Sequence, residues 1–152
     1  MTEGTRANRS GFRLESWVKD YLQECGYNDV SAKAFREQNG DDEPCFAKQC
    51  VIGQSIYGTK RKVDFVLRHP KLWPGGLVIQ CKWQASSGSV DEKYPYELAC
   101  INHLSFPTII VLDGGGYKPG AKEWLLGQVG SGNIRHVFDM GQFARFCSRG
   151  GI

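Results

Sequence analysis

The spacing of apolar residues near the N-terminus predicts an amphipathic helix. Between residues 14 and 25 they recur at every third or fourth position, as on one face of a helix. These residues are Leu14, Trp17, Val18, Tyr21, Leu22 and Cys25. Gly26 follows them and is a typical helix end. At about 100° per residue, Glu15 lies at the border of the apolar stripe beside Leu22, so its carboxylate can reach whatever the helix packs against.

Apolar runs farther along the chain predict strands. The runs cover residues 45–57, 61–68, 77–83, 107–113 and 134–138. Gly58 and Thr59 separate the first two runs, which indicates an antiparallel hairpin. The third run, LVIQCKW, is short, apolar and bounded by turn residues, as expected of a strand in the middle of a sheet. Between them, HPKLWPGG at residues 69–76 is expected to break the chain.

Three more helices are predicted, over residues 90–104, 121–128 and 141–147. Ser89 and Glu92 have the spacing of a capping box before the first of these. Pro95 favours a later start near Tyr94, because proline is tolerated only in the first turn of a helix. Residues 30–42 are polar and receive no assignment. The predicted order is α, β, β, β, α, β, α, β, α, which indicates an α/β fold.

Composition limits the class of protein. The 152 residues are 41% hydrophobic and 12% aromatic, enough for one domain with its own core. Residues 1–10 lack a hydrophobic period, so we expect a flexible basic arm there and a single domain over residues 11–152. No apolar run approaches the roughly 18 residues that cross a bilayer, and no signal peptide is evident, so a cytoplasmic protein is expected.

Neither the net charge nor the cysteine content identifies a function by itself. The net charge of +3 is too small to establish nucleic-acid binding without supporting chemistry. The six cysteines contain no CxxC pair, and they are expected to be buried free thiols rather than zinc ligands.

Three polar side chains stand where the strands are expected to be buried. Side chains alternate between the two faces of a strand, which sets Gln80 and Lys82 on one face of the third run. The same rule sets Asp64 on the face opposite to Val63 and Phe65. An ionised side chain in a buried strand costs several kcal/mol unless it is paired or bound to a metal.

Two interpretations explain these polar positions. Asp64 and Lys82 form a structural ion pair at one end of the sheet, or Asp64 and the amide oxygen of Gln80 hold a hard cation such as Mg²⁺ while Lys82 faces an anionic substrate. Glu15 is a candidate for a second carboxylate, or else an ordinary glutamate on the helix surface.

The residues of these segments resemble a known superfamily. The order α-β-β-β-α-β carries Glu15 in GFRLESWVKDYLQECGY, Asp64 in KVDFVL, and Gln80 with Lys82 in VIQCKWQ. This arrangement resembles the PD-(D/E)xK nuclease superfamily. Val63 stands where the motif name has proline, and Gln80 stands where a Glu or Asp is usual, although some restriction and homing endonucleases of the superfamily use Q-x-K. The resemblance implies a restriction-endonuclease-like αβββαβ core with a central mixed sheet flanked by helices.

The resemblance also implies roles for residues. Glu15, Asp64, Gln80 and Lys82 would be catalytic. Mg²⁺ would be bound by Asp64, by the backbone carbonyl of Cys81, by Gln80 and by Glu15, and Mn²⁺ is expected to substitute. Lys82 would orient the attacking water and offset charge on the phosphorus. The products would carry 5′-phosphate and 3′-hydroxyl ends.

Candidate DNA contacts lie in two segments beside these residues. The predicted hairpin carries Lys60, Arg61 and Lys62, which are suited to backbone phosphates. The segment after Lys82 offers hydroxyl groups and one more lysine. Its candidate residues are Ser86, Ser87, Ser89 and Lys93. For any one basic residue, a solvated hairpin tip is an equally good interpretation.

The implied activity is that of a Mg²⁺-dependent DNA endonuclease of restriction or homing type. Because so small a core holds one site, a homodimer is expected for a double-strand cut. A nuclease similar to Holliday-junction resolvases, a catalytically inactive DNA-binding subunit, and a structural protein without a nucleic-acid role are the alternatives.

Overall fold

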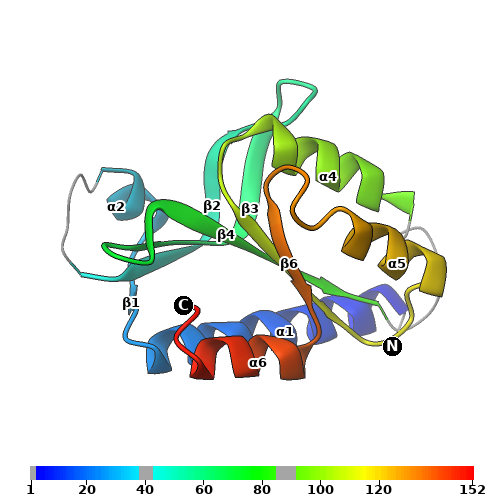
Figure 1. Cartoon of the computed structure of the whole chain (residues 1–152), viewed down its shortest axis with the longest axis horizontal. Helices are drawn as coiled ribbons and strands as arrows, with labels where there is room; N and C mark the ends of the chain where they lie inside the picture. The colour runs from blue at the N-terminus through cyan, green and yellow to red at the C-terminus, as the bar shows by residue number, and fades with distance from the viewer. Residues whose placement is uncertain (1–2, 38–42, 85–91) are drawn as a thin grey trace.

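The computed structural model describes residues 3–37, 43–84 and 92–152, with the backbone alone for residues 3–10. Its centre is a six-stranded sheet in the order β1-β2-β3-β4-β5-β6, with helices on both faces (Figure 1). The strands are β1 (Asn28–Asp29), β2 (Cys45–Gln54), β3 (Lys60–His69), β4 (Trp73–Trp83), β5 (Thr108–Asp113) and β6 (Ile134–Phe138). The helices are α1 (Glu3–Glu24), α2 (Ala32–Glu37), α4 (Tyr94–His103), α5 (Pro119–Gly127) and α6 (Met140–Ser148).

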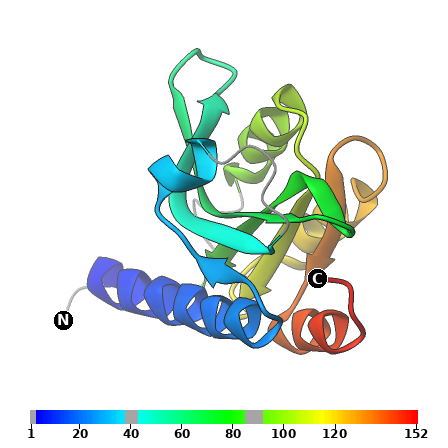
Figure 2. The same ribbon diagram turned by 90° about the vertical axis from the view of Figure 1, so that its left-hand side faces the viewer.

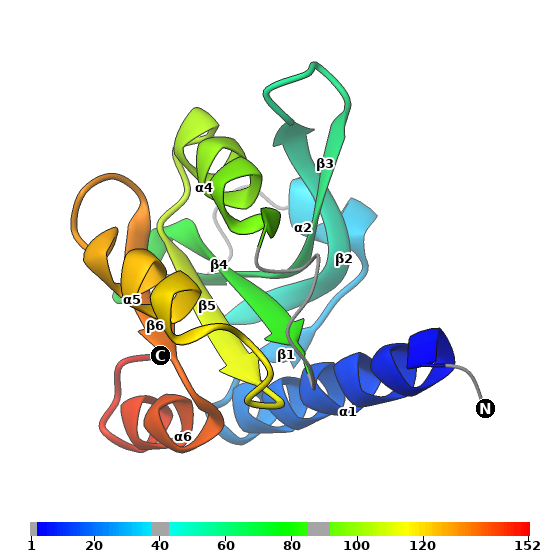
Figure 3. The ribbon, with the colours of Figure 1, turned by 90° about the vertical axis from the view of Figure 1, so that its right-hand side faces the viewer.

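The sheet is mixed, as predicted. Strands β2, β3 and β4 are antiparallel, whereas β4, β5 and β6 are parallel, and β1 runs parallel to β2. Helices α1 and α6 lie along one face, and α4 and α5 lie over the other (Figures 1 and 3). Among the described residues, no helix has the combination of length and apolar character needed to cross a membrane.

Helix α1 packs through the predicted stripe. Leu14, Val18 and Leu22 are buried against Leu77 and Ile79 of β4, with strands and α6 completing this core. Gly26, at φ +92°, ends the helix through the left-handed conformation that glycine adopts most readily. Figure 2 shows α1 running along the base of the molecule.

The structure differs from the sequence prediction in three segments. Helix α1 begins at Glu3 and therefore includes most of the predicted flexible arm. Residues added to an existing helix need no new nucleation, and this offsets the weak helix propensity of Gly4 and Gly11. Residues 30–42, which received no assignment, contain α2. Strand β4 begins at Trp73, within the segment 69–76 that was expected to break the chain. The break is shorter because His69 accepts backbone hydrogen bonds from Lys71 and Leu72 and closes a tight turn just before the strand.

Strands β3 and β4 separate halfway along their length. They pair through Phe65 with Ile79, and through residues beyond these toward the β3–β4 turn. On the other side of this pair, β3 continues beside β2 as far as Lys60, and β4 continues beside β5 as far as Trp83. The sheet therefore forks at the positions of Asp64 and Gln80.

The alternation of side chains along β3 breaks at this fork. Val63 packs beside Val66 on the α2 side of the sheet, whereas Phe65 packs against α1, so the prediction that Val63 and Phe65 share a face was wrong. Asp64 and Phe65 both line the same pocket next to α1. The residue opposite Asp64 on β2 is Gln49, whose φ of +48° is left-handed. This irregularity turns Asp64 toward α1.

Helix α4 follows the later of its two predicted starts. It begins at Tyr94 with Pro95 in its first turn, and Lys93 at the N-cap makes no side-chain capping bond. The predicted capping box depends on Ser89, which lies outside the described residues.

The ends of β4 and β5 are held together by a close backbone contact. Gln84 donates its N–H to Asp113 and accepts from Gly116. A Cβ at Gly114, which has φ +94°, would lie 2.3 Å from the carbonyl oxygen of Gln84, whereas a Cβ at Gly115, at φ +69°, meets nothing within 4 Å.

We therefore expect Gly114→Ala to destabilise the protein more than Gly115→Ala. Both variants incur the roughly 1–2 kcal/mol cost of a left-handed alanine, and Gly114→Ala adds about 1–3 kcal/mol of steric strain. Urea unfolding measures the difference. Equal losses for the two variants would show that the contact between Gly114 and Gln84 is not tight.

Candidate active site

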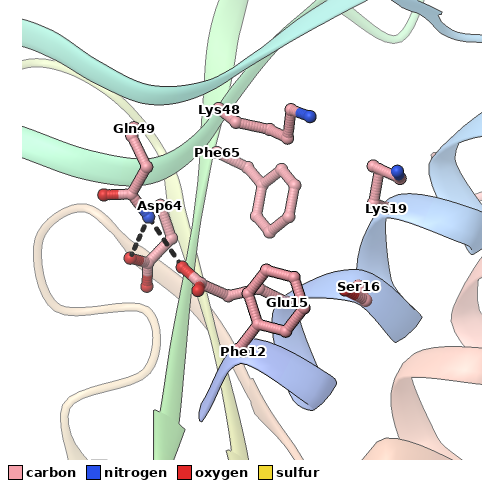
Figure 4. A pocket seen from close by; sticks show the side chains of 8 residues that line it. All are labelled: Phe12, Glu15, Ser16, Lys19, Lys48, Gln49, Asp64 and Phe65. Carbon is pink, nitrogen blue, oxygen red and sulfur yellow. Dashed lines mark hydrogen bonds between the residues drawn. The ribbon is translucent and has the colours of Figure 1, made fainter. Parts of the chain in front are cut away.

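Two carboxylates from distant parts of the chain converge beside the fork. Glu15 projects from α1, and Asp64 comes from β3 (Figure 4). The Nε2 of Gln49 lies between them and donates to Oε1 of Glu15 at 2.7 Å and to Oδ1 of Asp64 at 3.3 Å. The left-handed backbone of Gln49 is the kind of strained conformation that concentrates at functional sites.

The side chains of Asp64 and Gln80 bridge the gap between the separated strands. The N–H of Asp64 donates to Oε1 of Gln80 at 2.9 Å, and the N–H of Cys81 donates to Oδ2 of Asp64 at 2.8 Å. Backbone groups that lose their sheet partner need another one when they leave water. These two bonds supply it, and they fix Asp64 to both sides of the fork.

Glu97 of α4 forms a second layer behind the motif residues. Its Oε1 accepts from Nε2 of Gln80 at 3.0 Å and lies 3.7 Å from Nζ of Lys82. Arg61 binds both of its carboxylate oxygens, at 2.8 and 3.1 Å. Gln80 and Lys82 thus share the α4 face of β4, as the alternation predicted, and the negative charge absent from position 80 is present one hydrogen bond away.

The two glutamates have opposite electrostatic environments. Burial, followed by the hydrogen bond and the like charge of Asp64, raises the pKa of Glu15 to about 7, against the opposing influence of Gln49 and Lys82. Burial alone would raise the pKa of Glu97, but the hydrogen bond from Arg61 and the charges of Lys82 and Arg61 lower it below its ordinary value. Glu97 is therefore held as a carboxylate. For Glu15, a nearby cation would stabilise the charged form that its present surroundings disfavour.

A pocket of about 300 Å³ opens between α1, β2 and β3 at the two carboxylates. Its lining residues are Phe12, Glu15, Ser16, Lys19, Lys48, Gln49, Asp64 and Phe65. Two carboxylates and an amide suit a hard divalent cation, and lysines suit an anionic substrate. Within the described part of the chain, no three His, Cys, Asp or Glu side chains gather as a ready metal cluster, so further ligands would be amide or backbone oxygens.

Comparison with known families supports this chemistry. A family model described as the PD-(D/E)XK nuclease superfamily domain matches residues 6–150. The chain belongs to this superfamily. Comparison with curated proteins and with solved structures gives no match. Membership confirms the predicted restriction-endonuclease-like fold and indicates nuclease activity in general, and nucleases of this superfamily typically use divalent metals.

The fold brings together the residues that the sequence resemblance predicts to form the superfamily motif. Glu15 and Asp64 flank one amide, and Asp64 is hydrogen-bonded to Gln80. Gln80 is buried, at 3% exposure, and its amide oxygen is directed at the N–H of Asp64. Cys81 contributes its N–H to Asp64, and a metal contact through its carbonyl stays a prediction.

The predicted DNA-contact residues differ in their exposure to solvent. Lys60, Lys62 and Lys93 are exposed and available. Arg61 is buried and held in the ion pair with Glu97, so it serves the second layer rather than a phosphate. The predicted contacts Ser86, Ser87 and Ser89 lie outside the described residues.

Sequence analysis missed Gln49 and Glu97. Gln49 has no sequence pattern that marks it, because its role depends on a left-handed backbone angle in the middle of β2. Glu97 could have been found, because it follows Tyr94 by three residues and precedes Ile101 by four, in the buried stripe of α4. A glutamate at such a position needs a cationic partner.

The raised pKa of Glu15 predicts how it responds to its neighbours. Asp64→Asn should lower the pKa of Glu15, because it removes a like charge, and Lys82→Met should raise it, because it removes a cation. Carboxyl-carbon NMR titration in EDTA measures both shifts. Shifts in the reverse directions would contradict the arrangement.

The same pKa predicts a dependence of stability on pH without metal. Between pH 4.5 and about 7 the folded state holds the Glu15 proton more tightly than the unfolded state does. The contribution of Glu15 to the free energy of unfolding should therefore fall as pH rises through this window. Glu15→Gln should flatten that part of the profile, measured by urea unfolding in EDTA, and an unchanged slope would contradict the assignment.

The buried ion pair predicts a coupled effect on stability. Glu97→Gln leaves Arg61 without its counter-charge, at about 10% side-chain exposure, and should cost about 3–5 kcal/mol of unfolding free energy. The double variant Arg61→Met, Glu97→Gln should recover much of this loss, because the amide oxygen that replaces the carboxylate can still accept from Gln80. Additive losses in urea unfolding would show that the two residues are not coupled.

Proposed function

We propose that this protein is a Mg²⁺-dependent DNA endonuclease, of restriction or homing type, that leaves 5′-phosphate and 3′-hydroxyl ends. The observation that carries the proposal is the convergence of Glu15 and Asp64 on the amide nitrogen of Gln49. An N–H group between two carboxylates marks a place that attracts positive charge. Superfamily membership supports nuclease chemistry there.

The donor set fits a hard divalent cation. Asp64 and Glu15 would hold Mg²⁺, with the Cys81 carbonyl and the Gln80 amide oxygen as the remaining protein ligands, and Mn²⁺ would substitute. For Gln80 this role requires that its oxygen be shared with the N–H of Asp64. When bound, Mg²⁺ supplies Lewis acidity that polarises the phosphate and acidifies water.

The residues of the chain divide the remaining work. Lys82 orients the attacking water and offsets charge that develops on the phosphate, which is the kind of preorganised electrostatic stabilisation that dominates phosphoryl chemistry. Glu97 positions Lys82 and Gln80 from behind. Lys19 and Lys48, at the pocket, and the exposed Lys60 and Lys62 provide positive charge for the DNA backbone. A homodimer would bring two such sites to the two strands.

Variants of the motif test this function. Asp64→Asn and Lys82→Met should each lower Mg²⁺-dependent cleavage of plasmid DNA by about a hundredfold or more. The first removes a proposed metal ligand, and the second removes the cation that orients the water and offsets charge on the phosphate. Asp20→Asn on the exposed side of α1 and Lys33→Met on α2 make the same chemical changes away from the pocket, and they should cleave like the wild type.

The substrate and metal are compared in the same assay. EDTA should abolish cleavage, and either Mg²⁺ or Mn²⁺ should restore it. A four-way junction assayed beside the plasmid distinguishes junction resolution from duplex cutting. Undiminished cleavage by both motif variants would overturn the site, and DNA binding without cleavage under any of these conditions would indicate an inactive DNA-binding subunit.

A further inference from the structure

Two tyrosines form an exposed aromatic surface away from the pocket. Tyr57 stands at the tip of the β2–β3 hairpin and is 77% exposed, and Tyr96 on α4 is 39% exposed. Their rings stack with centroids 5.4 Å apart and planes 22° from parallel. We call this pair the aromatic platform. One face of the Tyr57 ring is covered by Tyr96, and the exposure of Tyr57 shows that the other is open to solvent.

The hairpin holds Tyr57 in place. The buried Ser55 is the centre of the turn, where its hydroxyl lies 2.7 Å from that of Thr59 and accepts from the N–H groups of Tyr57 and Thr59. The backbone bond from Ser55 to Thr59 closes the same turn at 2.7 Å. The hairpin projects from the body of the protein beside α4 (Figures 1 and 3). An aromatic ring held this way binds a ligand with little loss of side-chain entropy.

Positive charge connects the aromatic platform with the pocket. Lys60 and Lys62 are exposed and alternate along β3 with the buried Arg61, so they share a face with Asp64. Lys93 is exposed at the start of α4. A phosphate backbone that leaves the pocket along β3 would therefore meet lysines before it reaches Tyr57 at the tip of the hairpin. At about 3.3 Å per residue, Tyr57 is at most about 23 Å from Asp64, which corresponds to no more than about seven nucleotides at about 3.4 Å each.

We propose that the aromatic platform stacks an unpaired base of the DNA substrate, a few nucleotides from the cleaved bond. The proposal rests on DNA being the substrate. Base–aromatic stacking requires an open ring face and accepts any base, whereas the faces of bases within a duplex are covered by their neighbours. Because Tyr57 already lies flat against Tyr96, it presents a face rather than a wedge that would enter between base pairs. The preferred substrate is then a duplex that continues into a single strand.

Binding without catalysis tests the proposal. The affinity of the full chain is measured by fluorescence anisotropy in EDTA, for a blunt duplex and for the same duplex with a 3′ or 5′ tail of about ten nucleotides. The wild type should bind one tailed DNA more tightly than the blunt one. Tyr57→Ala should weaken binding of that tailed DNA by about 5- to 100-fold, the range of one lost base–aromatic stack, and leave the blunt duplex unchanged.

Matched variants separate stacking from other effects. Tyr57→Phe keeps the ring and should bind like the wild type. Trp124→Ala on α5 removes another aromatic residue of 39% exposure and should change neither affinity. A fluorescent adenine analogue in the tail should be quenched by the wild type and by Tyr57→Phe, and much less by Tyr57→Ala.

The outcomes distinguish this proposal from the proposed function. If Tyr57→Ala binds both DNAs like the wild type while plasmid cleavage persists, the platform proposal is overturned and the endonuclease function stands. Equal losses on blunt and tailed DNA would overturn the assignment to an unpaired base. If the wild type binds neither DNA and cleaves none, the proposed function itself fails.

Discussion

The separation of β3 from β4 at Asp64 and Gln80 is the constraint on which the site depends. Where two strands part, their backbone N–H groups lose partners, and here the side chains of the same strands replace them. The carboxylate of Asp64 is therefore fixed by the N–H of Cys81 as part of the sheet itself. The packing of the apolar stripe of α1 against the sheet then places Glu15 beside Asp64. The chemistry of the site follows from an interruption in the hydrogen bonding of the sheet.

The two faces of the fork carry different charge arrangements. On the α1 face, burial and then the neighbouring Asp64 raise the pKa of Glu15. On the α4 face, Glu97 is surrounded by Arg61 and Lys82, and its pKa is lowered. One face is thus short of positive charge, whereas on the other, two cations surround a single carboxylate. Although both faces contain a glutamate, only the α1 face has charges that a cation would offset. The α4 face holds protein side chains in position.

Sequence reasoning reached the order of the main elements and the mixed sheet, and it singled out the polar residues that meet at the fork. Each follows from a local periodicity or from a costly polar residue in an apolar run. It failed where a single backbone angle decides the outcome: the left-handed Gln49 and the change of face beside Asp64 are tertiary features with no local pattern. Arg61 illustrates a different limit. In a row of three basic residues, alternation makes the middle one face inward, but only the position of Glu97 explains why a buried arginine is tolerated.

Gln49 gives the site a built-in substitute for a counter-ion. Its Nε2 bonds to both carboxylates, so the partial positive charge of an amide offsets their repulsion. This offset comes from a side chain of the protein itself, whereas in some small domains a bound metal supplies it. The cation of the proposed function would have to displace this neutral side chain from the two carboxylates. The affinity of such a cation site would then be set by competition between a cation and an amide.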